Sequence, residues 1–486
     1  MRWCERLNAA LVLAYTCACG PSGAGPPRGP SPDLVPPAAD DTAIASDPPP
    51  PVVDRLNVIA FGAIADDVGD DTAAFQAAID AATEGQEVYA PAGRYRLGQG
   101  ADSLRISLGM SLVGDGAVLA GEGASGTMFE ISNRRADQGY APIDKLRVRG
   151  FVFDNVRLYF RGKRGARGAR DIEITDCTFQ NGYQLNVVGP RRKLKHWARP
   201  YASLIRVRDG RIERNTFLRS QGHGGRGVVI ESSADVLIKD NRFGKIENGR
   251  VTQAHFRTAI NVHGNDKRCD SMASDCVEYA EGISITDNVL LRGPSGEVST
   301  EPASEDHGIY VRTFRDVRIR RNTIRGWSPT AHGGSVKIRQ GTDALISENT
   351  MVGSGVLLNV YGNNHPHYLK RVQVVNNDID MQGAKCRKGE AHRGILYYRK
   401  LSRPEATGLE ESIEILDNRI TDGGCVAVVN ANAAGLCVAG NGLPTRVRNV
   451  EGKRFDGCRT SADGRRARAE TPVQLETQGD PTGAAD

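Results

Sequence analysis

Apolar and polar positions follow one short phrase that returns along the chain between residues 172 and 443. It consists of an apolar residue, two mostly polar residues, an Asn, one further residue and a second apolar residue. Full copies are Ile212–Phe217, Ile238–Phe243, Ile285–Leu290, Ile319–Ile324, Ile346–Met351, Val374–Ile379 and Ile415–Ile420. An earlier copy has Cys177 in place of Asn, and Val438–Leu443 is a degenerate last copy. The regular returns are 26 to 28 residues apart, which is typical of a solenoid whose units must stack to bury a core.

Each repeat alternates Val and Ile with polar residues and is broken by Gly, Asn and Asp, so each coil is predicted to contain short strands joined by turns. Stacked Asn amides can hydrogen-bond along a column, and neighbouring coils would lie about 4.8 Å apart. The pattern predicts an all-β fold, a right-handed parallel β-helix, with a short capping α-helix at its N-terminal end.

Composition divides the 486 residues into four parts. Residues 1–19 have a basic start and a short apolar stretch, which favour an export signal, and Cys19 resembles a bacterial lipid-attachment cysteine although Thr16 stands where Leu is usual. Residues 20–53 are rich in Pro, Gly, Ala and Asp and are predicted to be a disordered linker. Residues 54–458 form the predicted β-helix domain, and residues 459–486 a disordered tail. We expect an exported protein on the cell surface or in the periplasm, held to the membrane only through a lipid; plain secretion and a chance apolar start are the alternatives.

The first folded stretch predicts a cap. A strand at Asn57–Ala63 is followed by Asp70, Asp71 and Thr72, which supply capping oxygens for a helix over residues 73–82, and then by the strand Val88–Tyr95. This arrangement over residues 57–97 closely resembles the N-terminal signature of the pectate-lyase-like β-helix superfamily, which includes rhamnogalacturonase-type and epimerase-type enzymes. The resemblance implies the fold; it leaves the reaction open, because the superfamily contains lyases, hydrolases, epimerases and phage tail fibres.

Six cysteines fit an oxidising compartment. Cys269 and Cys276 share one insertion and are predicted to pair, while Cys386, Cys425, Cys437 and Cys458 would form two bridges of open pairing. Free buried thiols are the alternative, and for Cys177 a free thiol is the preferred interpretation.

The Asn phrase also aligns the strand that precedes it, coil by coil. Two outward columns follow from this alignment. The first contains Asn261, Tyr310, Lys337 and Asn359, and the second contains Glu231, His263, Arg312, Arg339 and Tyr361. His307, His332 and His365 lie in turns beside the same coils. Stacked Arg312 and Arg339 repel unless an anion lies between them, so the pattern favours an anionic ligand; an ordinary solvated face is the alternative.

The resulting hypothesis is a polysaccharide lyase or epimerase that acts on a uronic-acid-containing polymer. Arg312 and Arg339 would bind the carboxylate, Lys337 would remove the neighbouring proton, and Tyr310 or His307 would act as the acid. Basic loops at residues 157–170 and 191–199 extend the predicted sugar path or are simply solvated.

A hydrolase of the polygalacturonase-like type is the competing enzyme, supported by Gly222-His-Gly224 but not by a paired Asp. A non-catalytic glycan-binding or adhesion rod is the second alternative. Calcium is a possible cofactor, although no dense acidic cluster stands out and the metal prediction stays open. Nucleic acid is not an expected partner of an exported rod with interspersed acidic residues.

Overall fold

The computed structural model describes residues 55–98, 103–122, 128–135, 137, 139–164, 168–182, 199–219, 225–265, 277–293, 307–327, 334–361, 366, 368–383, 394–400, 412–429, 435–441, 445–448 and 474–475. The predictions for the export signal, Cys19 and the linker lie outside these residues. Within them, no helix is long and apolar enough to cross a membrane.

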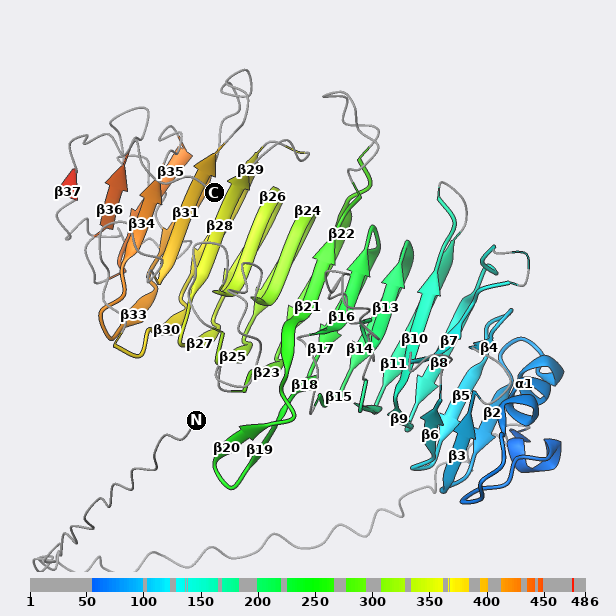
Figure 1. Ribbon diagram of the computed structural model, residues 1–486. Coiled ribbons are helices and arrows are strands. Elements are labelled where there is room, and N and C mark those ends of the chain that lie inside the picture. Colours follow the sequence, from blue (N-terminus) through cyan, green and yellow to red (C-terminus); the bar gives the residue numbers. More distant parts are fainter. Residues whose placement is uncertain are drawn as a thin grey trace, which may run out of the picture. The chain divides into compact units, whose positions relative to one another are not determined.

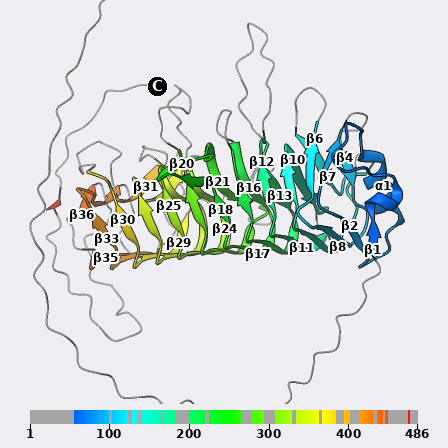
Figure 2. The same cartoon turned by 90° about the horizontal axis from the view of Figure 1, so that it is seen from below.

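The described residues after Val53 wind into coils that carry three rows of parallel strands (Figures 1 and 2). Row 1 consists of β4 (Ser103–Arg105), β7 (Phe129–Ser132), β10 (Val156–Arg161), β13 (Ala202–Ile205), β16 (Gly225–Glu231), β21 (Phe256–His263), the first halves of β24 (His307–Arg320) and β26 (Gly334–Ser347), β28 (Val356–Tyr361), β31 (Ile395–Lys400), β34 (Val426–Val429), β36 (Thr445–Arg448) and β37 (Gln474–Leu475).

Row 2 consists of β1 (Arg55–Asn57), β2 (Glu87–Ala90), β5 (Ser111–Gly114), β8 (Asp144–Arg149), β11 (Ala169–Thr175), β14 (Val207–Glu213), β17 (Ala234–Lys239), β22 (Ala280–Thr286), the second halves of β24 and β26, β29 (Leu369–Val375), β32 (Ile413–Leu416) and β35 (Leu436–Ala439). Row 3 consists of β3 (Arg94–Leu97), β6 (Val118–Gly121), β9 (Val152–Asp154), β12 (Thr178–Gln180), β15 (Thr216–Phe217), β18 (Arg242–Phe243), β23 (Val289–Leu291), β25 (Thr323–Arg325), β27 (Thr350–Val352), β30 (Asp378–Asp380) and β33 (Arg419–Thr421). An antiparallel hairpin, β19 (Lys245–Glu247) and β20 (Arg250–Thr252), lies outside the three rows. The predicted right-handed parallel β-helix is confirmed.

The repeated Asn forms a continuous hydrogen-bonded ladder at the turn between rows 2 and 3. At each step the backbone N–H and the side-chain amide of one Asn donate to Oδ1 of the Asn one coil on, as Asn288 does to Asn322 at 3.0 Å for both bonds. The ladder contains Asn215, Asn241, Asn288, Asn322, Asn349, Asn377, Asn418 and Asn441. Asn441 of the degenerate copy is therefore a full member, and the ladder pins the coils in register.

Cys177 begins the ladder as a buried free thiol, as its position predicted. Its backbone N–H donates to Asn215 Oδ1 at 3.0 Å, so the ladder can begin at a residue that has no side-chain amide. Burial raises the pKa of the Cys177 thiol to about 12, which makes it a small packing residue rather than a reactive group.

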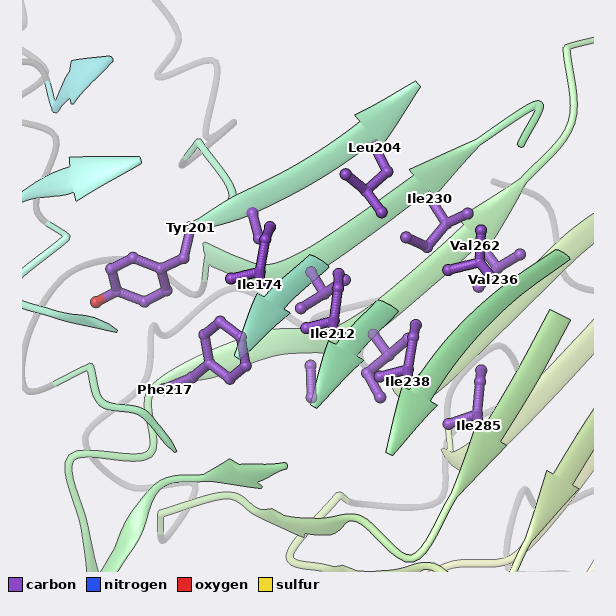
Figure 3. Close-up of a cluster of buried hydrophobic side chains, with 14 of the residues drawn as sticks. Ile174, Tyr201, Leu204, Ile212, Phe217, Ile230, Val236, Ile238, Val262 and Ile285 are labelled. Carbon is purple, nitrogen blue, oxygen red and sulfur yellow. The ribbon is translucent and has the colours of Figure 1, made fainter. Parts of the chain in front are cut away.

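The interior is apolar from coil to coil (Figure 3). In row 3 the rings of Phe153, Phe179, Phe217 and Phe243 stack with centroid distances of 4.9, 4.9 and 4.6 Å. Row 3 continues with aliphatic side chains after Phe243, because the equivalent positions become Leu290 and Ile324. Each coil thus covers the apolar face of the preceding one, as a solenoid requires.

The N-terminal end is closed by the 3-10 helix η1 (Val58–Phe61) and by α1 (Thr72–Ala81), which buries Phe75, Ala78 and Ile79. Asp70 Oδ1 accepts from Thr72 N at 3.0 Å and caps the helix as predicted. Asp71 makes no side-chain cap; its carboxylate instead accepts from Ile64 N at 2.8 Å and from Arg96 N at 3.0 Å. Asp71 therefore ties the cap to the first coil.

Two of the predicted disulfide cysteines are described. Cys425 and Cys437 are buried, and both are disulfide-bonded residues. Cys269, Cys276, Cys386 and Cys458 lie outside the described residues, so the pairing stays a prediction.

Candidate functional site

The outward side chains of row 1 form two adjacent columns on β16, β21, β24 and β26. Column 1 contains Asn261, Tyr310 and Lys337, which are paired in register. Column 2 contains Glu231, His263, Arg312 and Arg339, also paired in register. The predicted pairings of Tyr310 with Lys337 and of Arg312 with Arg339 are confirmed, and each pair spans one coil spacing of about 4.8 Å.

The register predicted for β28 is wrong by two residues. Lys337 pairs with Leu357, and Arg339 pairs with Asn359. Asn359 therefore belongs to column 2, and Tyr361 pairs with Lys400 farther along the strand. Asn359 lies 18 residues before Asn377, whereas Arg339 lies 10 residues before Asn349. The distance to the ladder therefore does not give the register of β28, and the match of its alternating pattern misplaced it. A shift of two preserves which side each residue faces, so Asn359 remains outward.

Three side chains meet at the centre of column 1. The His307 ring lies 5.0 Å from the Tyr310 ring, centroid to centroid. Lys337 Nζ lies 5.5 Å from the centroid of the same Tyr310 ring. The site thus places an amine, a phenol and an imidazole within reach of one small group.

Column 2 places acidic and basic groups side by side. His263 Nε2 lies 3.9 Å from Glu231 Oε2, and His263 Nδ1 lies 3.3 Å from the carbonyl oxygen of Gly264. Burial lowers the pKa of His263, the Arg312 guanidinium lowers it further, and Glu231 opposes both effects. His263 is therefore held as a neutral imidazole beside the two arginines.

Several of these outward residues are nevertheless buried. The exposed fraction is 6% for Lys337, 4% for Asn359, and 1% for both Asn261 and His307. Within the described part of the chain, Asn261 Oδ1 is buried and accepts no hydrogen bond. A buried acceptor without a donor is uncommon in native proteins, and a bound hydroxyl or ammonium group would satisfy it.

Other predicted positions fall elsewhere. His332, His365 and the Gly222–Gly224 triplet lie outside the described residues, as does most of the basic segment 191–199. The segment 157–170, predicted as a basic loop, is instead partly β-strand: β10 extends to Arg161 and β11 begins at Ala169. The alternation of apolar and polar residues in Val156–Arg161 is the sequence signal for this strand.

A separate groove of about 1200 Å³ follows the corner between rows 1 and 2. Arg206, Ser232, Glu278 and Tyr279 are among its lining residues. Lys163 and Arg170 of the predicted basic segment also line it, but none of the predicted residues of the two columns does. Arg206 is paired with Glu278 at 2.9 Å, so these charges satisfy one another. The chemistry-bearing side chains therefore gather on row 1 rather than in this groove.

Among the described residues, no three His, Cys, Asp or Glu side chains lie close enough to hold a metal ion. The described residues of the candidate site are cationic, phenolic, amide and imidazole groups with Glu231 as the one carboxylate among them, which is a donor set poorly suited to calcium.

Comparisons with known proteins give a family match and several distant likenesses. Residues 55–189 match the family described as rhamnogalacturonase A/epimerase, pectate lyase-like. The mannuronan C5-epimerase AlgE4 of Azotobacter vinelandii is 43% identical over 77 residues, which are 15% of this chain and 13% of that enzyme. AlgE2 of the same organism is 50% identical over 66 residues, which are 12% of this chain and 7% of that enzyme. The matches therefore span a small part of these relatives.

Two solved structures resemble the chain over most of its length. The A-module of Azotobacter vinelandii AlgE4 has a TM-score of 0.41 and 18% identity, covering 82% of this chain and 95% of that one. The Yersinia enterocolitica family 28 exopolygalacturonase has a TM-score of 0.47 and 13% identity, covering 82% and 76%. The resemblance predicted from residues 57–97 is confirmed: residues 55–189 carry the pectate-lyase-like rhamnogalacturonase A/epimerase sequence signature.

Proposed function

We propose that this protein is an exported enzyme that acts on a uronic-acid-containing polysaccharide, as a lyase or an epimerase. The observation that carries the proposal is the in-register pairing of Tyr310 with Lys337 beside Arg312 with Arg339. The partial sequence match to mannuronan C5-epimerases, enzymes named for a uronate polymer, supports the substrate class.

The chemistry begins at the uronate carboxylate. Arg312 and Arg339 bind it, since guanidinium matches carboxylate with two parallel hydrogen bonds. Neutralising the carboxylate lets the carbon–hydrogen bond at the adjacent C5 break, because the electron pair moves into the carboxylate system. A positive site of two arginines stabilises the negative charge that develops there.

Lys337 removes the C5 proton with its amine, two residues from Arg339 on the same face of β26 and within reach of the same sugar ring. Tyr310 or His307 then acts as the acid. In a lyase, the acid protonates the departing O4 as a double bond forms between C4 and C5. In an epimerase, it returns a proton to C5 from the opposite face, and no bond of the polymer breaks.

Both columns supply groups that orient the sugar. Neutral His263 and Asn359 offer hydrogen bonds beside the arginines, while Asn261 offers its buried acceptor to a sugar hydroxyl.

The test exposes the purified chain, with and without calcium, to a panel of acidic polysaccharides in deuterated water. Ultraviolet absorbance reports unsaturated uronate, and NMR reports deuterium incorporated at C5. Activity on one polymer that Lys337→Ala abolishes is the expected result. Lys239→Ala, on the exposed face of row 2, removes the same charge from a different face and should retain activity.

Full activity of a folded Lys337→Ala variant would refute the assigned base. New reducing ends without unsaturated uronate would identify a hydrolase instead. Binding without either reaction would identify a glycan-binding rod.

A further inference from the structure

The two outward columns of the candidate site continue toward the N-terminal coils. In column 1, the strand pairings lead from Tyr310 through Asn261, Val229 and Ser203 to Tyr159. In column 2, they lead from Arg312 through His263, Glu231 and Ile205 to Arg161. Tyr159 and Arg161 thus repeat the aromatic and cationic pairing of Tyr310 and Arg312 four coils away, or about 19 Å along the rod.

A second cluster of aromatic and cationic side chains surrounds these two residues. The Tyr140 and Tyr159 ring centroids are 6.1 Å apart, and the Arg161 guanidinium lies 5.1 Å from the Tyr140 ring. The Arg157 guanidinium lies 5.2 Å from the Tyr159 ring and pairs with Glu130. We refer to Tyr140, Arg157, Tyr159 and Arg161 as the β10 cluster.

The side chain of Asn133 links the two segments that carry the β10 cluster. Asn133 is fully buried, and its side chain donates to the carbonyls of Ala141 at 2.7 Å and Arg161 at 2.8 Å. Asn133 Oδ1 accepts from Arg161 N at 2.9 Å. These bonds fasten the segment that carries Tyr140 onto β10, so the two tyrosine rings are positioned before any ligand arrives.

The charges of the β10 cluster do not cancel. Glu130 pairs with Arg157, which leaves the cluster with the positive charge of Arg161. Arg157 Nε is buried and, in the described part of the chain, makes no hydrogen bond. A cationic group framed by aromatic rings suits a sugar that presents an apolar ring face and a carboxylate.

In the opposite direction, the described residues do not repeat the pairing of a column 1 tyrosine with a column 2 arginine. Beyond Lys337, column 1 continues as Leu357, Leu396 and Ala427, which pack together and are buried. Column 2 continues from Arg339 through Asn359, Tyr398 and Val429 to Arg448. Among the described residues of these columns, a tyrosine of column 1 beside an arginine of column 2 therefore recurs only toward β10.

We propose that the β10 cluster is a distal subsite that binds an acidic sugar residue of the same polymer chain whose reacting unit lies at Lys337. This proposal rests on the proposed function and adds the direction of the chain and its length requirement. Several sugar units span the distance, so short oligomers contact one site and long oligomers contact both.

The experiment measures the affinity of the full chain for uronate oligomers of increasing length by calorimetry. Wild type should bind oligomers long enough to span both sites more tightly than short ones. Tyr159→Ala and Arg161→Gln should each weaken binding of the long oligomers about tenfold and leave short-oligomer affinity unchanged. Arg211→Gln, which removes a charge from row 2, should leave both affinities unchanged.

Tyr159→Phe keeps the ring and should retain most of the long-oligomer affinity, which controls for folding together with unchanged thermal midpoints. If the Tyr159→Ala and Arg161→Gln variants weakened oligomer binding equally at every length, or not at all, the distal subsite would be overturned and the proposed function would remain in place. Absence of any uronate binding by wild type would refute the proposed function, and the subsite with it.

Discussion

Replacing Asn322 with Ala tests whether the Asn ladder holds the coils together. Asn322 Oδ1 accepts from the backbone N–H and the side-chain amide of Asn288, both at 3.0 Å. Its own amide donates to the carbonyls of Ile285 at 2.9 Å and Arg320 at 3.0 Å, and to Asn349 Oδ1 at 3.0 Å. Alanine removes all five bonds from the interior.

The largest cost is the Asn288 backbone N–H, which is left buried without an acceptor; such a group costs about 1–3 kcal/mol. The Asn288 amide retains its bonds to Ile238 and Thr286, so its loss is smaller. Adding about 0.5–1.5 kcal/mol for each of the remaining bonds gives a destabilisation of about 3 kcal/mol or more.

Thermal and urea unfolding, followed by far-ultraviolet circular dichroism, measure the effect. Thr323→Ala is the matched control, because Thr323 follows Asn322 directly as the first residue of β25 and its side chain is exposed. A difference below about 1 kcal/mol between the two variants would refute the ladder as a main source of stability.

Three further predictions concern the cap, the thiol and the candidate site. Asp71→Asn turns one of the two acceptor oxygens into a donor that faces Ile64 N or Arg96 N, so it should lower the free energy of unfolding by about 1–3 kcal/mol. Asp80→Asn, on the exposed face of α1, should leave the free energy of unfolding unchanged. Equal thermal midpoints for the two variants would contradict this prediction. Cys177, with its thiol pKa raised to about 12, should resist iodoacetamide in the native protein at about pH 8 and react after unfolding, as mass spectrometry would show; native-state alkylation would disprove the burial argument. Because the folded state lowers the pKa of His263, it binds fewer protons there than the unfolded chain, and stability should fall as pH drops below about 6.5. His263→Gln should reduce that fall, measured as unfolding midpoints between about pH 7.5 and pH 5, and an identical pH dependence would count against the lowered pKa.

The sequence was sufficient for the fold because the ladder requires one residue type. Each Asn from Asn215 to Asn418 must present an acceptor to the preceding coil and an amide donor to the following one, so the phrase stays recognisable even where insertions separate its copies. The N-terminal cap could also be predicted from the sequence, although the Asp71 side chain binds the first coil rather than the helix that it precedes. Its actual partners are 7 and 25 residues away, and no local capping rule contains them.

The site was predictable where coils have equal length or where the alternating strand pattern alone gave the right pairing, as it did for Asn261 with Tyr310 and His263 with Arg312. Tyr310 and Lys337 were aligned correctly because β24 and β26 each run without interruption from row 1 into row 2. Asn359 and Tyr361 were misplaced because β28 ends before its coil turns into β29. The β10 cluster was missed for another reason: Tyr140 reaches Tyr159 through the contacts of Asn133, which no repeat pattern encodes.

These differences arise because the inward and outward residues of each coil make different contacts. Inward residues and the ladder Asn contact the coils on both sides, so a change at one of them disturbs two interfaces. Outward residues of row 1 do not pack into the interior, so they can change in kind from Tyr159 to Ser203, Asn261, Lys337 and Leu357 without altering the register. A β-helix can therefore move, lengthen or end a binding track by substitution in one column while its fold is unchanged. On the proposed function, the outward residues of row 1 set the path of the polymer, and the length dependence of binding is the property that the Tyr159 and Arg161 variants should alter most.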